Sequence, residues 1–491
     1  MSEAANTYEV VVVGAGSGGI GAALAAGRLG LRVLLLEKAP RLGGNAALGG
    51  VSVWEMGVGG TGIPFTIYKR LKQLPEAVGI YEFSEHCAWP DASGRSTFPA
   101  GAWLTINPAL TYLDTLRRHG AESLAADEAF VRRHWHGVPF EPAAYQQVVE
   151  TLLAELPTVE VRTGVSFTSA TERGGRVEAL RLSDGTEARA RYFIDATESG
   201  FLCQAVGAQT LYGQEPRSRF DEPSAPEVPT PKVNGVSLIF RIAPRSLAAV
   251  DPLPAGIPAD CWWSECFPLT SFVQYPNGDF NVNMLPTMDG GTFRTWDPDT
   301  VREECRRRTL AHWHYLQSTF PRFQRYTRIA EAEALGVRES TRILGEYVLT
   351  EHDVRAGLSG QAHPDLITLV DHPMDTHGNS TGRAGCVELA EPYGVPFRCL
   401  IPRGFQNLLI ASRGASLSSL AASSCRLSRT MMQLGQAAGT AVFVALEAGL
   451  STWDELDYQV LRAQLEAQHV QLHHPLKAEL LQYLAEENEG T

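Results

Sequence analysis

The sequence predicts an α/β fold in which a Rossmann-like dinucleotide-binding domain carries an inserted α+β domain. An apolar strand, a glycine-rich turn, a small-residue helix and a second apolar strand follow one another near the start of the chain. Further strand and helix patterns return to this unit after a middle block with a hairpin signal and aromatic residues. Strands that alternate with helices favour a parallel sheet.

The glycine-rich turn follows the predicted buried strand YEVVVV and has G-x-G-x-x-G spacing. Gly14 permits a tight turn, Gly16 lets a pyrophosphate approach the backbone, and Gly19 lets helix and strand pack closely. The phosphate charge then meets the free N–H groups at the helix N-terminus. We therefore expect cofactor contacts from Gly14, Gly16, Ser17, Gly18 and Gly19.

The second apolar strand, residues 32–36, ends in Glu37, which lies 37 − 14 = 23 residues after Gly14. This spacing is close to the roughly 20 residues expected for the acid that binds the ribose hydroxyls. Its carboxylate would accept hydrogen bonds from the ribose and would repel a 2′-phosphate. A glycine-rich turn in another kind of α/β unit is the alternative, and the complete order of elements disfavours it.

Glu37 also begins the run E-K-x-x-x-x-G-G, which ends in Gly43 and Gly44. This run resembles the large flavoprotein superfamily that binds FAD, whereas nicotinamide dehydrogenases do not usually carry it. The resemblance implies that the Gly-Gly pair directs the chain along the ribityl-pyrophosphate toward the flavin. An ordinary turn is the alternative. The implied FAD contacts are Glu37, Lys38, Arg41, Gly43, Gly44 and Asn45.

Residues 141–198 are expected to complete the cofactor domain with an amphipathic helix, a meander of strands and a final strand ending at Asp195. This order resembles the second half of an FAD domain. The resemblance implies an adenine contact through the backbone of Val165 and pyrophosphate contacts at Ala196 and Thr197. The usual A-T-G step is A-T-E here, which leaves the local backbone at Glu198 open.

Two later motifs are G-V-R-E-S-x-R-I-x-G-x-Y-V-L-T, at residues 336–350, and G-Q-A-A-G-T-A, at residues 435–441. Together they resemble an FAD-dependent oxidoreductase family that includes proteins labelled xanthan lyase-like and is related to the fumarate-reductase type. The resemblance implies that a helix opening at Gln433 points its positive N-terminal end at the flavin. The implied cofactor residues are Arg413, Gly435, Gln436 and Ala438.

The favoured catalytic segment is DHPMDTHGN, residues 371–379, which holds two imidazoles and two carboxylates. Hydride transfer to flavin N5 requires a group that removes a proton, and a neutral histidine oriented by a carboxylate serves this purpose near pH 7. We predict His377 as the base, His372 as the second candidate and Asp375 as the nearby carboxylate. A loop with surface histidines is the alternative.

Arginines near the return motifs are predicted to bind a substrate carboxylate, because the guanidinium fork binds a carboxylate with two hydrogen bonds. Arg338 and Arg398 are the main candidates and Arg342 is the third. Ion pairing with neighbouring glutamates is the alternative. Tyr275 and Glu339 are the next positions for the base if the histidines fail.

The predicted division of the chain places the insertions between parts of the cofactor domain. The boundaries are 1–53 for the first part of the FAD-binding domain, 54–140 for a helical or irregular insertion, 141–211 for the second part, 212–330 for the substrate domain, 331–450 for the return segment and 451–491 for C-terminal helices.

Composition limits the partners and the compartment. The net charge of −13 argues against nucleic acid and against an anionic membrane surface. We expect no membrane span, no signal peptide and no metal site, since the H-x-H pair at His134 and His136 has no third ligand nearby. The eight cysteines are scattered without C-x-x-C, which predicts free thiols and a cytoplasmic protein. The sequence does not indicate an oligomeric state.

The leading hypothesis is an FAD-dependent oxidoreductase, either an oxidase or a dehydrogenase, that oxidises a small organic substrate by hydride transfer to flavin N5. An FAD-dependent monooxygenase is disfavoured because S-R-G-A-S, residues 412–416, replaces the G-D-A-A-H type segment of hydroxylases. A flavoprotein with a structural flavin or an RNA-modifying role is a further alternative, and the acidic charge disfavours RNA.

Overall fold

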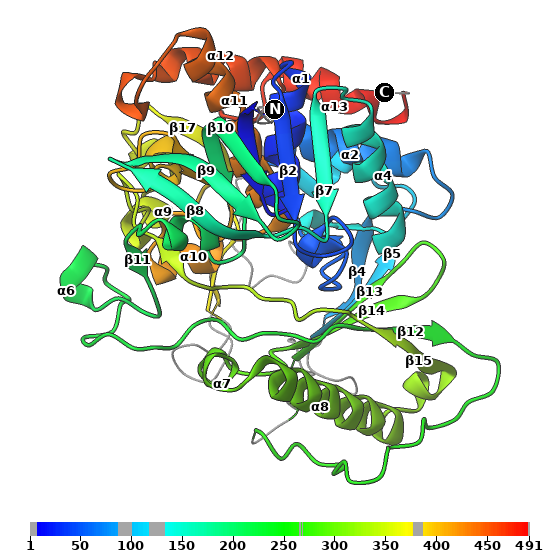
Figure 1. The fold of residues 1–491 in the computed structure, drawn as a ribbon. Helices are drawn as coiled ribbons and strands as arrows, with labels where there is room; N and C mark the ends of the chain where they lie inside the picture. The colour runs from blue at the N-terminus through cyan, green and yellow to red at the C-terminus, as the bar shows by residue number, and fades with distance from the viewer. Residues whose placement is uncertain are drawn as a thin grey trace.

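The computed structural model describes residues 7–86, 101–116, 133–264, 267, 269–376 and 386–489. A cofactor domain built on a mainly parallel sheet lies in the upper part of Figure 1, and a second domain with its own sheet and the long helix α8 lies below it. The α/β fold with a Rossmann-like unit is therefore confirmed.

The cofactor domain has a seven-stranded sheet in the order β7-β2-β1-β10-β9-β8, with β21 also paired to β10. The strands β7, β2, β1, β10 and β21 run parallel, and β8 and β9 form an antiparallel extension. Val10, Val11 and Val12 are fully buried, as expected for a parallel strand covered on both faces. The bounds are β1 Thr7–Val13, β2 Val33–Glu37, β7 Val159–Thr163, β8 Phe167–Arg173, β9 Arg176–Leu182, β10 Glu187–Asp195 and β21 Leu408–Ile410.

Helices α1 (Ser17–Arg28) and α11 (Ser428–Glu447) pack together along one face of this sheet. Their backbones approach so closely that a Cβ atom on Gly435 would lie 1.8 Å from the carbonyl oxygen of Gly18. A Cβ atom on Gly439 would likewise lie 2.4 Å from the carbonyl oxygen of Ala22. The small residues of both helices therefore serve helix–helix packing.

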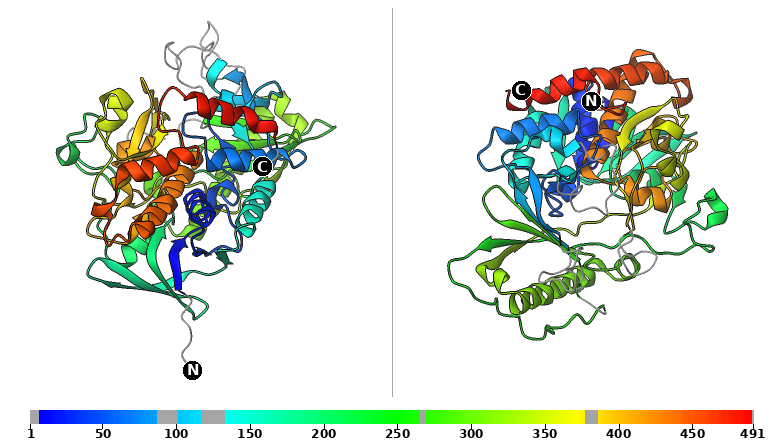
Figure 2. Two further views of the ribbon diagram at one scale, coloured as in Figure 1. Left: turned by 90° about the horizontal axis from the view of Figure 1, so that it is seen from above. Right: turned by 180° about the vertical axis from the view of Figure 1, so that it is seen from behind.

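The C-terminal helices α12 (Tyr458–Ala467) and α13 (Ala478–Ala485) lie at the end of the cofactor domain that faces away from the second domain (Figures 1 and 2). Helix α12 packs on α11, and the ring of Tyr483 in α13 lies 5.0 Å from that of Phe65 in α2 (Ile63–Lys72). The Nζ atom of Lys72 in this region lies 2.8 Å from a carboxylate oxygen of Glu487. The prediction of C-terminal helices after residue 450 agrees with this arrangement.

The second domain contains a six-stranded sheet in the order β15-β12-β14-β13-β5-β4. The helix α8 (Pro298–Thr319) covers it, and aromatic side chains that include Trp103, Phe272 and Trp313 fill the interface. The predicted hairpin around the P-N-G-D turn is confirmed as β13–β14. The bounds are β4 Tyr81–His86, β5 Gly101–Ile106, β12 Phe240–Pro244, β13 Leu269–Gln274, β14 Phe280–Leu285 and β15 Tyr326–Glu331.

Strands β4 and β5 come from the block 54–140, which the sequence indicates as helical or irregular. Strand β4 pairs with β5, and β5 pairs with β13 of the later block, so the prediction is wrong for residues 81–86 and 101–106. The physical reason is that β5 pairs in parallel with β13, about 170 residues later in the chain, and such a distant partner leaves no local turn signal.

Most of the remaining elements are short, and α4 is the longest of them. They are η1 Gly44–Ala46, β3 Val53–Trp54, η2 Tyr112–Leu116, β6 Val138–Pro139, α4 Pro142–Ala154, α5 Phe201–Ala205, β11 Thr210–Leu211, α6 Arg217–Phe220, α7 Gly290–Thr295, η3 Pro321–Arg325, β16 Arg342–Ile343, α9 Glu351–Gly360, β17 Leu366–Val370, β18 Met374–Asp375, β19 Cys386–Val387, β20 Tyr393–Pro396, η4 Phe397–Leu400, α10 Ser419–Ser424, η5 Trp453–Glu455 and η6 Glu486–Asn488.

A buried polar cluster joins the two domains beside residues 50–52. The hydroxyl groups of Ser52 and Tyr275 lie 2.5 Å apart, and the amide of Asn281 donates to Tyr275 (3.0 Å) and to the carbonyl of Gly50 (2.8 Å). Burial raises the pKa of the Tyr275 phenol. Tyr275 therefore fixes the domain contact.

Within the described ranges, no helix is both long and apolar enough to cross a membrane. The same residues contain no group of three or more His, Cys, Asp or Glu side chains arranged to hold a metal ion.

Candidate active site

The ends of three parallel strands form the floor of the predicted cofactor site. A Cβ atom on Gly14, after β1, would lie 2.8 Å from the carbonyl oxygen of Ala196, after β10. The hydroxyl of Ser412, after β21, donates to the carbonyl of Thr197 (2.6 Å). The Thr197 hydroxyl also donates to buried Asp195 (2.6 Å), so the A-T-E step has a fixed backbone without the usual glycine.

The glycines of the turn have different surroundings. A Cβ atom on Gly18 would lie 1.8 Å from the carbonyl oxygen of Ala411, and one on Gly19 would lie 1.7 Å from that of Gly14. Gly16 has no atom within 4 Å of such a Cβ, although it caps α1. Gly18 and Gly19 are thus required by packing, and the space beside Gly16 is open for a ligand.

The N-terminal turn of α1 has free hydrogen-bond donors. Its first helical bond runs from Ile20 N–H to the Gly16 carbonyl (3.0 Å), so the N–H groups of residues 17–19 precede the intrahelical ladder. A helix N-terminus with free N–H groups is a binding site for phosphate. This geometry fits the pyrophosphate of FAD.

Glu37 is 8% exposed at the end of β2 and lies beside this turn. Its carboxylate accepts hydrogen bonds from the N–H groups of Ala15 (2.7 Å) and Ala39 (2.8 Å). A carboxylate has about four lone-pair positions, so acceptor capacity remains for a ribose. The N–H of Val165, in the connection between β7 and β8, donates to the Glu37 carbonyl (3.0 Å), which leaves the Val165 carbonyl for an adenine contact.

The Gly43–Gly44 turn lies directly against the glycine-rich turn. Both residues have positive φ (107° and 50°), and a Cβ atom on Gly44 would lie 3.0 Å from the Cα atom of Gly16. Asn45 follows, and its amide donates to the Val337 carbonyl (3.0 Å). Lys38 and Arg41 lie nearer the surface, Lys38 over the ring of Phe201 and Arg41 paired with Glu333.

A cavity begins at Asn45 and extends between the two domains. Its wall includes residues 51 and 53–55 from the cofactor domain, Asn283 from β14, residues 336–338, and residues 413 and 426–429. The Nε1 of buried Trp54 and the Oδ1 of Asn283 have no hydrogen-bond partner among the described residues. These polar atoms, together with the open space at Gly16, fit a ligand with donor and acceptor edges such as the flavin ring.

Helix α11, whose N-terminal end lines this cavity, begins earlier than predicted. The expected start at Gln433 is wrong, because α11 begins at Ser428. Gly435, Gln436 and Ala438 lie in the helix interior, where Gly435 packs on α1 and Gln436 accepts a hydrogen bond from the Ile63 N–H (3.2 Å). The N-cap residue is a leucine without a side-chain cap, so the sequence carried no start signal there.

Arginine side chains dominate the charge of the cavity wall. Arg338 donates from Nη1 to the Gly235 carbonyl (3.0 Å), and Arg413 donates from Nε to the Arg426 carbonyl (3.2 Å). Burial, strengthened by the charge of Arg426, lowers the pKa of both Arg338 and Arg413 to about 10. These groups stay protonated at neutral pH, and the cavity is an anion-attracting site.

Glu55 and His372 form a pair at the cavity. The Nε2 of His372 lies 3.3 Å from a carboxylate oxygen of Glu55, whose side chain is 49% exposed and lines the cavity. Burial alone would raise the pKa of the Glu55 carboxyl, but the contact with His372 and the charge of Arg426 lower it to about 2. His372 is 4% exposed, and its carbonyl accepts a hydrogen bond from Ser424.

The structure changes the predicted roles in the segment 371–379. The carboxylate beside His372 is Glu55, whereas Asp375 lies 3.3 Å from Nη2 of Arg426. His377, the favoured base, lies outside the described residues. Glu55 was missed because no local pattern links it to His372, 317 residues later (372 − 55 = 317).

Two of the three predicted carboxylate-binding arginines lie elsewhere. Arg398 pairs with Asp365 through Nε and Nη2, each 3.0 Å from a carboxylate oxygen, and does not line the cavity. Asp365 thus occupies the guanidinium fork, and the substrate role of Arg398 stays a prediction. Only Arg338 of the predicted set lines the cavity.

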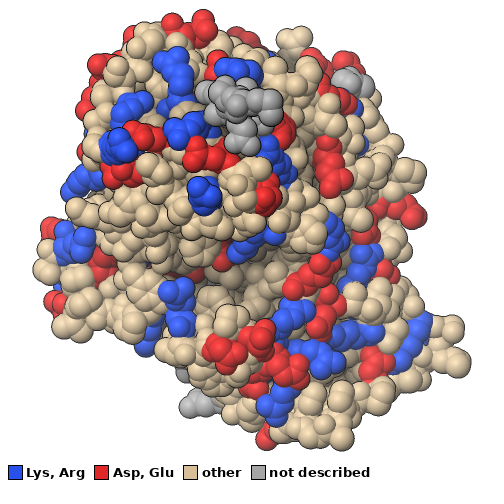
Figure 3. All heavy atoms as spheres, in the orientation of Figure 1, with Lys and Arg blue, Asp and Glu red and all other residues tan. Residues whose placement is uncertain are grey.

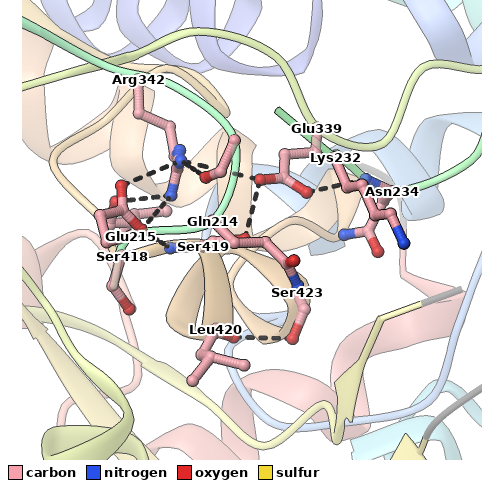
Figure 4. A network of polar contacts seen from close by, with 12 residues as sticks. Gln214, Glu215, Lys232, Asn234, Glu339, Arg342, Ser418, Ser419, Leu420 and Ser423 are labelled. Atoms are coloured by element: carbon pink, nitrogen blue, oxygen red, sulfur yellow. Dashed lines mark hydrogen bonds and ion pairs between the residues drawn. The ribbon is translucent and has the colours of Figure 1, made fainter. Parts of the chain in front are cut away.

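Arg342 belongs to a buried network, shown in Figure 4, in which its guanidinium lies 3.1 Å from Glu215 and 3.8 Å from Glu339. Glu339 also accepts hydrogen bonds from the Asn234 N–H (2.8 Å) and the Ser419 hydroxyl (3.2 Å), and burial raises its pKa. This network does not line the cavity, so Arg342 and Glu339 are structural in this arrangement.

A family model described as FAD dependent oxidoreductase matches residues 9–465. This protein belongs to the FAD-dependent oxidoreductase family. Its cofactor is FAD, and the open Gly16 turn, the free N–H groups of α1 and the unpartnered polar atoms of the cavity fit that group.

Two curated relatives match short segments. The 4-oxocyclohexanecarboxylate 2-dehydrogenase of Sinomonas cyclohexanicum is 49% identical over 49 residues, 10% of this chain and 8% of the relative. The 3-oxosteroid 1-dehydrogenase of Mycolicibacterium smegmatis (strain ATCC 700084 / mc(2)155) is 51% identical over 47 residues, again 10% and 8%. The matched segments span less than a tenth of either relative.

Solved structures are similar at low identity. A geranylgeranyl bacteriochlorophyll reductase-like protein from Thermoplasma acidophilum is 12% identical, with 98% of this chain and 96% of that chain covered and a TM-score of 0.46. The p-nitrophenol 4-monooxygenase of Pseudomonas putida is 12% identical, with 98% and 93% covered and a TM-score of 0.42. At these scores the likeness carries no information on the substrate.

Proposed function

We propose that this FAD-dependent oxidoreductase oxidises a small organic substrate by hydride transfer, and that the Glu55–His372 pair accepts the proton that leaves with it. The observation that carries the proposal is the position of this pair. Glu55 lines the cavity that begins at Asn45, and the Nε2 of His372 lies 3.3 Å from its carboxylate.

Bound FAD supplies a two-electron acceptor at N5 of its isoalloxazine ring. The substrate C–H bond then gives up a hydride, and an O–H, N–H or second C–H bond gives up a proton. A carboxylate–imidazole pair is suited to take that proton, because the Glu55 carboxylate stabilises the positive charge that forms on His372 when its imidazole is protonated. Asn45, Trp54 and Asn283 would hold and orient the ring and the substrate around it.

The test begins with a substrate screen by anaerobic bleaching of the purified, FAD-loaded enzyme. With a substrate in hand, Glu55→Gln and His372→Gln should retain FAD and slow flavin reduction by about 10²- to 10⁴-fold, the usual size of general-base catalysis. His352→Gln, which changes an exposed histidine of α9, is the matched control and should reduce at the wild-type rate.

Two results would change the assignment of the proton acceptor. Wild-type reduction rates in both Glu55→Gln and His372→Gln would refute the pair. A large loss in His377→Ala without a loss in Glu55→Gln would assign the base to His377, the residue that the sequence favours.

A further inference from the structure

We propose that the substrate carries a small anionic group of the carboxylate class, which Arg338 and Arg426 bind at the cavity wall. This inference rests on the proposed oxidoreductase function, since it concerns the same cavity. The anion site and Glu55, the proposed proton acceptor, then share one cavity.

The charge of the cavity wall is the first observation. Four arginines, at positions 338, 413, 426 and 429, line it with one glutamate, Glu55, which gives a net charge of 4 − 1 = +3. The whole chain has a net charge of −13, and on the face in Figure 3 the Lys and Arg side chains are interspersed with Asp and Glu. A concentrated positive wall in an acidic protein attracts an anion.

The hydrogen bonds of these arginines separate their roles. Arg429 donates to the Thr115 hydroxyl (3.0 Å) and to backbone carbonyls at Glu55 and Gly57, so it holds the chain. Arg413 follows β21 beside the floor of the cofactor site, so we assign it to the cofactor and not to the substrate. Arg338 and Arg426 remain for a substrate.

Arg338 has the greatest unused capacity. Its Nη1 donates to the Gly235 carbonyl, and its Nε and Nη2 make no hydrogen bond to any described residue. No carboxylate among the described residues lies within 4.0 Å of it. Arg426 donates from Nε to the Ser423 carbonyl (2.9 Å) and from Nη2 toward Asp375, which leaves Nη1.

The mutual repulsion of the arginines favours the same ligand. Burial and the nearby charges of Arg426 and Arg413 lower the pKa of Arg338, and the carboxylates of Asp375 and Glu55 offset this effect only in part. An anion between Arg338 and Arg426 would relieve this repulsion and satisfy the free N–H groups. A planar carboxylate matches the fork of N–H donors.

Arg338 is held in place from behind. Its neighbour Glu339 and the next arginine, Arg342, are fixed in the buried network of Figure 4, and the N–H of Gly336 donates to the Ser237 carbonyl (2.8 Å). The backbone on both sides of Arg338 is therefore anchored. A preorganised guanidinium loses little freedom when it binds an anion.

The test measures binding to the FAD-loaded enzyme through the visible absorption of the flavin. Acetate, propionate and benzoate are compared with acetamide, propionamide and benzamide, which have nearly the same shape without the charge. We expect saturable changes with the carboxylates and weaker binding of the amides. Arg338→Gln should weaken carboxylate binding by about 10- to 150-fold, the range of a lost hydrogen bond to a charged group, and remove the preference over amides.

Arg173→Gln is the matched control, because it removes the same charge from a side chain that is 79% exposed, and it should bind as wild type. Arg338→Lys keeps the positive charge but lacks the paired N–H donors of the guanidinium, and it replaces Arg338→Gln in the test if that variant does not fold. It should show an intermediate loss. Arg426→Lys should also weaken the carboxylates more than the amides.

Three results would overturn the inference. The first is a carboxylate series without a saturable change, and the second is equal binding of carboxylates and amides by wild type. The third is an Arg338→Gln variant that retains FAD and binds the carboxylates as tightly as wild type does. A loss of carboxylate binding in Arg338→Gln, with wild-type reduction rates in Glu55→Gln, would retain the anion site and refute only the proton acceptor.

Discussion

Replacing Gly16 by alanine separates cofactor binding from folding more cleanly than other changes in the glycine-rich turn. The added methyl group meets no protein atom within 4 Å, and the backbone of Gly16, with φ of −76° and ψ of −169°, is open to any residue. The apoprotein should therefore be as stable as wild type, or more stable by about 0.4–1 kcal/mol, because alanine restricts the unfolded chain.

The substitution should weaken FAD binding without destabilising the apoprotein. The methyl group occupies the space through which the pyrophosphate reaches the free N–H groups of residues 17–19. Loss of two hydrogen bonds to a charged group, at about 1.5–3 kcal/mol each, gives about 3–6 kcal/mol. This corresponds to a Kd raised by about 10²- to 10⁴-fold. Gly16→Ala should purify with little flavin and remain folded.

The assay combines the flavin-to-protein absorbance ratio, a titration of apoprotein with FAD and thermal unfolding of the apoprotein. Gly435→Ala is the matched control, since its methyl group would lie 1.8 Å from the Gly18 carbonyl oxygen. Overpacking costs about 1–3 kcal/mol or more, so this variant should unfold at a lower temperature. An unchanged FAD affinity in Gly16→Ala, or an apoprotein as unstable as Gly435→Ala, would refute the reasoning.

Three further substitutions test burial and charge. Glu37→Ala should weaken FAD at least about tenfold and cost the apoprotein about 1–3 kcal/mol for each of the two backbone N–H groups that lose their acceptor; unchanged FAD titration and urea unfolding would contradict this. Burial lowers the pKa of His312 to about 3, so below about pH 6.5 the unfolded chain binds a proton that the folded protein does not. Stability should fall by about 1.4 kcal/mol per pH unit from this group as pH decreases from 6.5 toward 3. His312→Gln should flatten the slope measured by urea unfolding, and an identical slope would exclude His312 as its source. Arg342→Met should cost about 3–5 kcal/mol, because it leaves Glu215 and Glu339 buried without a cation. Adding Glu215→Gln and Glu339→Gln should recover part of this loss in the same denaturation assay, and no recovery would argue against the charge explanation.

The cofactor unit could be predicted from sequence because its signals are local. The strand before Gly14, the spacing to Glu37 and the Gly43–Gly44 turn all lie within one short stretch of chain. Backbone conformation and close approach limit the residues that fit there, so the pattern itself specifies a structure. The strands β1, β2 and β10 agree with the predicted positions for the same reason.

Local patterns were ambiguous where one residue type serves two purposes. The small residues around Gly435 are suited both to approach a ring and to pack two helices, and the structure shows the packing. Their helix starts at Ser428 behind a leucine, which gives no capping signal. The sequence identified the helix but not the residue at which it begins.

The choice among equivalent polar residues was decided only by tertiary structure. Arg338 and Arg342 lie four positions apart in one motif, yet the first faces the cavity and the second is buried between two glutamates. Glu55 contacts His372 because two segments far apart in the sequence come together in the fold, and no periodic pattern in the sequence predicts that contact. By itself the sequence determined the nucleotide-binding unit, whose geometry depends on neighbouring residues. The charge and proton chemistry of the cavity depend on long-range packing, and the three-dimensional fold alone decided them.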